Sequence, residues 1–163
     1  MTHINQPFLA IGKIIPAFSL PGADGMPHSP LDYKQRQHLI LLFLSSASSR
    51  ETRGFLRTFS KVYSAFREEH CSILAISPNK VLDNLQTQDE IHLPFPILAD
   101  PKGEVFSRYT THNATTGTYN PCIVLADCFN ALYQQWIAER EADLPPIQEL
   151  LDLLQYLNTL CTP

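Results

Sequence analysis

The architecture of this chain follows from one segment, Leu39-Ile-Leu-Leu-Phe-Leu44, and its continuation, Ser45-Ser-Ala-Ser-Ser-Arg-Glu-Thr52. The first part is apolar throughout, which predicts a central β-strand that is covered on both faces. The second part is rich in hydroxyl side chains and leads at once into an amphipathic helix. A strand that runs into a helix N-terminus creates a place where an anion, such as a thiolate, is stabilised. Here that place contains no cysteine.

The helix is predicted from the apolar positions between Ser49 and Glu69. They recur with the 3.6-residue period of a helix that buries one stripe, at Phe55, Leu56, Phe59, Val62, Tyr63 and Phe66. Ser48 or Ser49 is the expected N-cap, since a serine side chain can accept a hydrogen bond from the first free backbone N–H groups. Glu51 in the first turn suits the positive end of the helix dipole.

Further strands and helices alternate along the rest of the chain. Apolar runs predict strands, and periodic segments predict helices. The expected strands are 18–20, 39–44, 71–77, 120–126 and 131–137, the last two forming an antiparallel hairpin around a turn at 127–130. The expected helices are a single turn at 29–35, then 49–69, 80–91, 104–109 and a final helix around 147–157. Residues 93–100 contain two prolines and are expected to be a short extended piece rather than a central strand, and 110–118 a flexible loop.

This order predicts an α/β fold of one domain over residues 1–163. Parallel strand–helix–strand units lead into an antiparallel hairpin and a terminal helix, which together give a mixed sheet of four or five strands with helices on both faces. The fold class is therefore a three-layer α/β/α sandwich.

Composition restricts the function classes. The net charge is −4, so the chain has no basic field that would attract nucleic acid or an anionic membrane. The longest apolar run has six residues, against about 20 for a membrane-spanning helix. The N-terminal residues lack the pattern of a signal peptide. We therefore expect neither nucleic-acid nor membrane partners, and a cytoplasmic location.

The cysteines give no redox or metal motif. Cys71, Cys122, Cys128 and Cys161 show no CxxC spacing, and the six histidines are scattered. Neither set has the spacing of metal ligands. In a reducing compartment these cysteines are expected to be free thiols. We expect no metal and no cofactor.

Several segments, in the correct order, resemble one known family. Gly12-Lys-Ile-Ile-Pro16-Ala-Phe18-Ser-Leu20 is similar to its opening pattern G-x-x-x-P-x-F-x-L, and Gly25 to Tyr33 is similar to its continuation. Leu93-Pro-Phe-Pro-Ile-Leu-Ala-Asp-Pro-Lys-Gly-Glu-Val-Phe-Ser-Arg-Tyr109 and Pro121 to Asp127 resemble two later segments. The family is the peroxiredoxin or redoxin group, of the alkyl hydroperoxide reductase/thiol-specific antioxidant type. The resemblance spans about residues 11–138 and implies a thioredoxin-like fold, with homodimers as a common form.

The chain departs from this family at the reactive site. The family pattern PxxxTxxC aligns with Ser45 to Thr52, so that Ser45 stands in place of the proline, Ser49 in place of the threonine and Thr52 in place of the peroxide-reacting cysteine. The family's site arginine aligns with Pro121. If the segment is aligned with the CxxC of thioredoxin instead, the cysteine positions fall on Ser48 and Glu51. No cysteine precedes Cys71, so no alignment supplies one.

This substitution removes the usual chemistry from the site. Peroxide reduction requires a thiolate that attacks oxygen and becomes a sulfenic acid. A threonine hydroxyl stays protonated at neutral pH and does not accept an oxygen atom in this way. The hydroxyls of 45–52 and the nearby Arg50 and Arg53 could instead hold an anion at the helix N-terminus, or could form an ordinary solvated N-cap.

The resemblance also places Asn120 and Pro121 in a loop that faces this helix, with Pro121 at the position of a cis-proline. Cys122 would then lie close to the vacated site. It is the candidate nucleophile if any cysteine is reactive, and otherwise a small buried residue of the strand.

Three functions remain open. The first is a redoxin relative without peroxidase chemistry that keeps a binding or regulatory role, with a pocket between Ser45 to Thr52 and Tyr119 to Pro121 for a small molecule or a protein. The second is a thiol-dependent antioxidant oxidoreductase that uses Cys122. The third is a protein-interaction module that uses another surface.

Overall fold

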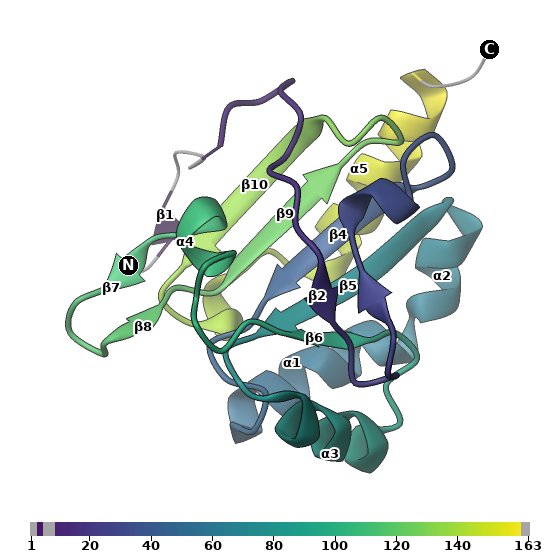
Figure 1. Cartoon of the computed structure of the whole chain (residues 1–163). Helices are drawn as coiled ribbons and strands as arrows, with labels where there is room; N and C mark the ends of the chain where they lie inside the picture. The colour runs from purple at the N-terminus through teal and green to yellow at the C-terminus, as the bar shows by residue number, and fades with distance from the viewer. Residues whose placement is uncertain (1–2, 5–8, 161–163) are drawn as a thin grey trace.

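A six-stranded mixed β-sheet forms the centre of the computed structural model, which describes residues 3–4 and 9–160 (Figure 1). The strand order is β1-β10-β9-β4-β5-β6. Strands β4, β5 and β6 are parallel, while β9 runs antiparallel to β4, β10 to β9 and β1 to β10. The bounds are β1 His3–Ile4, β4 His38–Phe43, β5 Cys71–Ser77, β6 Ile97–Ala99, β9 Cys122–Ala126 and β10 Leu132–Ala138.

Strand β4 is the central strand that the apolar run predicts. All six of its residues are buried. Leu41 lies between Leu74 of β5 on one side and Val124 of β9 on the other. Because β4 is paired along both edges and covered on both faces, every side chain has to be compatible with a buried position. The strand begins one residue earlier than the sequence suggests, at His38.

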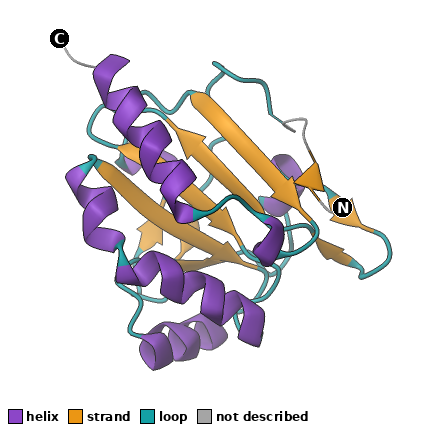
Figure 2. Ribbon diagram, turned by 180° about the vertical axis from the view of Figure 1, so that it is seen from behind, coloured by secondary structure: helices purple, strands orange, loops and turns teal. Residues whose placement is uncertain are grey.

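One face of the sheet is covered by α1 (Arg50–Lys61), α2 (Tyr63–Glu68) and α5 (Ile147–Leu160), as Figure 2 shows from behind. Leu56, Phe59 and Phe66 pack with Leu150, Leu154 and Leu157 in one core against that face. The prediction of one helix over 49–69 is wrong at Val62, where φ is −119° and ψ is 19° and the chain breaks into α1 and α2. Helix α3 (Val81–Ile91) contacts β6 and α1.

The opposite face has a thinner cover. It consists of the short helix α4 (Phe106–Tyr109) and the segment 9–33. In this segment β2 (Leu20–Pro21) pairs with β3 (Pro27–His28), and the 3-10 turn η1 (Pro30–Asp32) follows. Phe43 stacks on Tyr109 with ring centroids 4.8 Å apart, and Phe18 meets Tyr109 edge-on at 5.8 Å. These aromatic contacts form a second core on the α4 face.

Of the two expectations for the loops, one is confirmed and one is corrected. Residues 93–100 contain the short β6, which pairs in parallel with β5 at the edge of the sheet, as expected for an extended piece that is not a central strand. The polar segment 110–118 is ordered into a small hairpin of β7 (His112–Asn113) and β8 (Thr118–Tyr119). Gly117, with φ of 73°, permits its turn. Short polar strands lack the apolar alternation by which strands are recognised from sequence.

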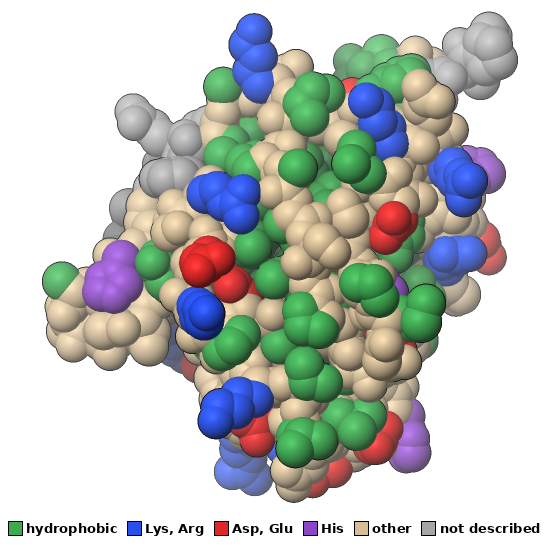
Figure 3. Space-filling model, in the orientation of Figure 1, with side chains coloured by type: hydrophobic (Ala, Val, Ile, Leu, Met, Phe, Trp, Pro, Cys, Tyr) green, Lys and Arg blue, Asp and Glu red, His purple; other side chains and the backbone are tan. Residues whose placement is uncertain are grey.

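The surface carries both signs of charge. On the face drawn in Figure 3, basic, acidic and hydrophobic side chains are interspersed. Within residues 3–4 and 9–160, no helix combines the length and apolar character needed to cross a membrane. In the same part of the chain, His, Cys, Asp and Glu side chains form no group of three that could hold a metal ion.

We predict that Leu154→Ala lowers the free energy of unfolding by about 2–5 kcal/mol, because it leaves a cavity in the core beneath α5. Urea unfolding followed by circular dichroism measures this change. The neighbouring exposed residue provides the control, since Gln155→Ala is expected to change stability by less than about 0.5 kcal/mol. Equal effects of the two substitutions would contradict the assignment of the α5 core face.

Candidate functional site

The N-terminus of α1 lies at the carboxyl end of β4, as the sequence predicts. Ser49 is the N-cap, and its Oγ accepts a hydrogen bond from the backbone N–H of Thr52 at 3.1 Å. Thr52 is completely buried in the first turn of the helix. Ser45 Oγ lies 3.5 Å from Thr52 Oγ1, so three of the predicted site residues meet at one point.

A carboxylate that the sequence analysis missed completes this cluster. Strand β10 ends at Ala138, and the 3-10 turn η2 (Glu141–Asp143) then places Glu141 beside the start of α1. Glu141 Oε1 accepts hydrogen bonds from the Ser45 backbone N–H at 2.8 Å, from Ser45 Oγ at 2.7 Å and from Thr52 Oγ1 at 3.2 Å. The side chain is only 3% exposed.

The hydroxyls form a chain that ends on this carboxylate. Ser49 Oγ donates to Thr52 Oγ1 at 2.7 Å, and Thr52 Oγ1 donates in turn to Glu141 Oε1. A carboxylate accepts strong hydrogen bonds and is favourable near a helix N-terminus. Glu141 contacts α1 through the Thr52 hydroxyl and not through a backbone N–H of the helix, so a carboxylate of the protein itself lies beside the helix N-terminus, and the hydroxyls of Ser45, Ser49 and Thr52 are already engaged.

Two ion pairs lie near the cluster. Arg140 donates to Glu51 across an exposed ion pair of 3.2 Å. Arg53 forms an ion pair with Glu90 of α3. Ser48, expected within the site, lies at the surface and its Oγ is 3.1 Å from Ser46 Oγ. This pattern favours an internally satisfied N-cap over an open anion-binding site.

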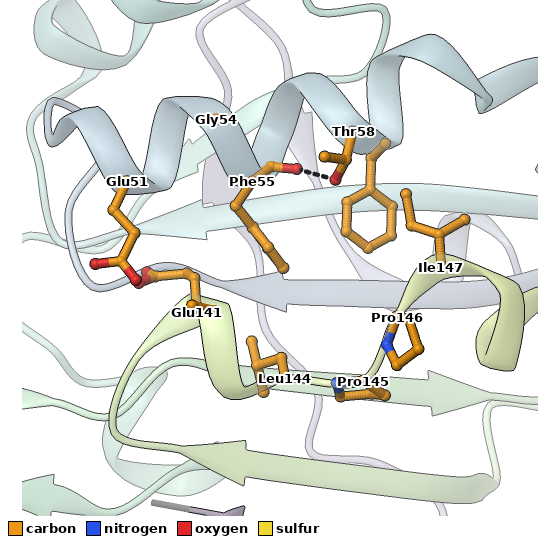
Figure 4. Close-up of a pocket in the computed structure, with 11 residues that line it drawn as sticks. Glu51, Gly54, Phe55, Thr58, Glu141, Leu144, Pro145, Pro146 and Ile147 are labelled. Carbon is orange, nitrogen blue, oxygen red and sulfur yellow. Dashed lines mark hydrogen bonds between the residues drawn. The ribbon is translucent and has the colours of Figure 1, made fainter.

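A groove opens beside this cluster. Its volume is about 450 Å³, and it runs between α1 and the connection from β10 to α5 (Figure 4). Apolar side chains line most of its length, and Glu51 and Glu141 lie at one end. The lining residues are Glu51, Gly54, Phe55, Thr58, Phe59, Glu141, Ala142, Leu144, Pro145, Pro146 and Ile147.

A smaller cavity of about 190 Å³ lies on the other side of Ser45. Ser45 and Tyr119 both line it, which is the arrangement expected for the pocket between 45–52 and the loop before β9. Pro78, Lys102 and Gly103 contribute further walls, whereas Asn120 and Pro121 do not. Since Ser45 also donates to Glu141, the Ser45–Glu141 hydrogen bonds separate this cavity from the larger groove.

The expected cis-proline is corrected. No cis peptide bond occurs among the described residues, so Pro121 follows Asn120 through a trans bond. Asn120 is held in line with β9 because its N–H donates to Thr111 O at 2.8 Å and its carbonyl accepts from Thr110 Oγ1 at 2.9 Å.

The Cys122 side chain lies on the face of the sheet opposite α1, so it cannot serve as the nucleophile at the start of α1. It pairs with Phe43, and its side chain packs in the α4-side core with Phe43 and Tyr109, whereas α1 packs on the other face. Its Sγ is fully buried and accepts a hydrogen bond from Gln135 Nε2 at 3.4 Å. Burial raises the pKa of the Cys122 thiol to about 12, although the hydrogen bond from Gln135 lowers it. The expectation that Cys122 rests beside the vacated site is wrong.

The other cysteines offer no replacement near α1. Cys71 is fully buried at the start of β5, where burial raises the pKa of its thiol. Cys128 lies in the turn between β9 and β10 and is partly exposed. Cys161 lies outside the described residues.

We predict that the Cys122 thiol resists alkylation in the folded chain. The thiolate is the reactive form, and a pKa of about 12 leaves roughly a thousandfold less thiolate at neutral pH than an unperturbed thiol would have. Iodoacetamide labelling at pH 7.5, read by mass spectrometry, is expected to modify Cys122 only after unfolding in urea. Rapid labelling in the native chain would contradict this placement.

The same burial predicts a loss of stability in alkali. Above about pH 8.5 the unfolded chain loses a proton that folded Cys122 retains to about pH 12, so the free energy of unfolding falls as the pH rises through this window. Cys122→Ala lacks this contribution. Urea titrations of the two proteins between pH 8 and 10 are expected to show the smaller decline for the variant, and equal declines would contradict the prediction.

Glu141 and Arg140 are the functional candidates that sequence reasoning missed. Both belong to Glu139-Arg-Glu-Ala-Asp143, a charged segment after the last strand that is typical of a solvated loop. Only the burial of Glu141 distinguishes it from its neighbours. A single sequence carries no signal that this carboxylate, rather than the one at 139 or 143, turns toward α1.

Comparisons with known proteins agree with the geometry of the fold. The model of the AhpC/TSA family matches residues 11–133. Candidate peroxiredoxins from two strains of Mycobacterium tuberculosis are 33% identical to the chain over 101 residues, which is 62% of this chain and 64% of each relative. The matched region thus spans less than two thirds of the length of these relatives.

Solved structures resemble the chain over most of its length. Enterococcus faecalis AhpC has a TM-score of 0.82 at 16% identity and covers 92% of this chain and 93% of its own. Mycobacterium tuberculosis AhpC has a TM-score of 0.80 at 20% identity, covering 96% and 97%. The peroxidoxin BcpB of the same organism has a TM-score of 0.77 at 17% identity, covering 91% and 97%. These neighbours show a thioredoxin-like fold of the peroxiredoxin type.

Proposed function

Since the chain belongs to the AhpC/TSA family, we propose that it is a redoxin that does not reduce peroxides at α1 and that uses the retained scaffold to bind another molecule. In this proposal Thr52 occupies the position of the family's peroxide-reacting cysteine. A binding role beside α1 replaces the thiol chemistry.

The buried carboxylate of Glu141 is the observation that carries this proposal. A working site needs a thiolate, a cation that stabilises it and room for a peroxide. Glu141 Oε1 instead receives three hydrogen bonds at the start of α1. A carboxylate at this position disfavours a neighbouring thiolate, because like charges repel at short range.

An oxidoreductase that uses Cys122 is supported less well. Its thiol is fully buried, and burial raises its pKa to about 12. The groove and the smaller cavity both lie next to the Ser45–Glu141 hydrogen bonds, whereas neither is lined by Cys122. This placement supports binding near α1 over thiol chemistry in the core.

Peroxide kinetics test the proposal directly. The reduced chain is mixed with hydrogen peroxide, and dimedone traps any cysteine whose thiolate has attacked the O–O bond to give a sulfenic acid and water. We expect slow labelling of all four cysteines and no peroxide consumption above that of a free thiol. Rapid and selective oxidation of Cys122 that disappears in Cys122→Ser would overturn the proposal.

Restoring a cysteine tests the role given to Glu141. We predict that the thiol pKa of Thr52→Cys is about one to three units higher than that of Thr52→Cys/Glu141→Gln, because the carboxylate opposes the negative thiolate. Thiolate absorbance at 240 nm measured against pH gives both values. Thr52→Cys/Glu104→Gln, which removes an equal charge at an exposed site, is expected to match the single variant. A pKa that Glu141→Gln leaves unchanged would show that the carboxylate does not act on this position.

The homodimer that the family resemblance implies and the cytoplasmic location stay predictions.

A further inference from the structure

The groove beside α1 has two unlike parts. Along its length, Phe55 and Phe59 of α1 face Leu144, Pro145, Pro146 and Ile147 of the η2–α5 connection, which makes its walls largely apolar. At one end, Glu51 and Glu141 bring two carboxylates, from α1 and from η2 (Figure 4). A ligand that fits this groove must therefore combine an apolar body with a positively charged group that can pair with a carboxylate.

Only one oxygen of the Glu141 carboxylate is engaged with the protein. Its Oε1 accepts all three hydrogen bonds, from Ser45 and Thr52, whereas Oε2 makes none to residues 9–160. Within the same residues Glu141 has no ion-pair partner, whereas Glu51 is paired with Arg140. Oε2 is not among the described buried atoms that lack a hydrogen-bond partner, so it is open to solvent. An ammonium group that reached it would form a charge-assisted hydrogen bond.

We propose that this groove binds a small organic amine, with its ammonium group on Glu141 Oε2 and its apolar body along Phe55, Phe59 and Ile147. The volume of about 450 Å³ lies within the range of about 300–1,000 Å³ that small-molecule pockets occupy. Two carboxylates against the single guanidinium of Arg140 leave this end of the groove with a net negative charge, which disfavours an anionic ligand. The ligand class deepens the binding role proposed above and rests on it, but its test measures binding alone. A peroxidase activity would therefore overturn the earlier proposal and leave the amine site standing.

Gly54 keeps the groove open. It lies in α1 on the lining of the groove, and a Cβ built on it meets no heavy atom within 4 Å. A larger side chain at this position would stand in the groove without disturbing the helix. Replacing a helical glycine also raises helix propensity. Gly54→Leu therefore separates an effect on the groove from an effect on folding.

The probes are three compounds that share an apolar body and differ in their polar end: phenylbutylamine, phenylbutanol and phenylbutyrate. Binding to the full chain is followed by nitrogen-15 NMR, which reports on the backbone N–H groups of Gly54, Phe55 and Ile147. We expect the amine to shift these signals at saturable millimolar concentration or below, the alcohol to bind roughly tenfold more weakly, and the carboxylate not to bind.

Three variants define the site. Glu141→Gln keeps an oxygen that can accept from Ser45, and we expect it to weaken amine binding about tenfold or more. Gly54→Leu is expected to abolish binding while the melting temperature stays the same or rises. Glu104→Gln, with the same change in charge at an exposed position away from the groove, is expected to bind like the unmodified chain.

Several results would overturn the proposal. Equal affinities for the amine and the alcohol would do so, as would an unchanged affinity of Glu141→Gln for the amine. NMR shifts confined to exposed acidic residues outside the groove would also do so. So would full amine binding by a folded Gly54→Leu variant. A second copy of the chain could instead cover the groove. A dimer in sedimentation, with amide signals at 54 and 55 that do not respond to the amine, would therefore also overturn the proposal.

Discussion

The hydrogen bonds between Glu141 and the start of α1 are the constraint on which the candidate site depends. They join the end of β10 to the β4–α1 connection, 96 residues away in sequence. Hydrogen bonds to a charged group contribute about 1.5–3 kcal/mol each, so three of them can hold η2 against α1. They also place a carboxylate of the protein itself beside the first turn of α1. The same contacts therefore shape the groove and disfavour a thiolate.

The fold could be predicted because its main elements are encoded locally. The run from Leu39 to Leu44 and the run from Cys71 to Ser77 are apolar at every or nearly every position, and only buried central strands tolerate this. The N-cap could be narrowed to Ser48 or Ser49 from their place before an apolar stripe, and the structure assigns it to Ser49. The break at Val62 could not be predicted, because the apolar stripe continues through Val62, Tyr63 and Phe66. The polar hairpin 112–119 could not be predicted either, because short polar strands lack apolar alternation.

The site could be predicted only where its residues are neighbours in sequence. Ser45, Ser49 and Thr52 converge because a strand that turns into a helix brings them together within eight residues. The position of Cys122 required the register of β9 on β4. Successive side chains of a strand point to opposite faces, so the pairing of Cys122 with Phe43 turns the thiol away from α1. One residue of slip would have placed it on the α1 face.

Glu141 connects the groove with the smaller cavity. Its Oε1 accepts from Ser45, which lines the smaller cavity, and Glu141 itself lines the groove, with an Oε2 that accepts no hydrogen bond from residues 9–160. A cation that approaches Oε2 draws electron density from the carboxylate and weakens the bonds that Oε1 accepts from Ser45 and Thr52. Because such coupling is reciprocal, stronger hydrogen bonds from Ser45 to Oε1 would in turn weaken the interaction of Oε2 with a cation. A residue that stands between the groove and the smaller cavity can in this way connect what binds on either side of it.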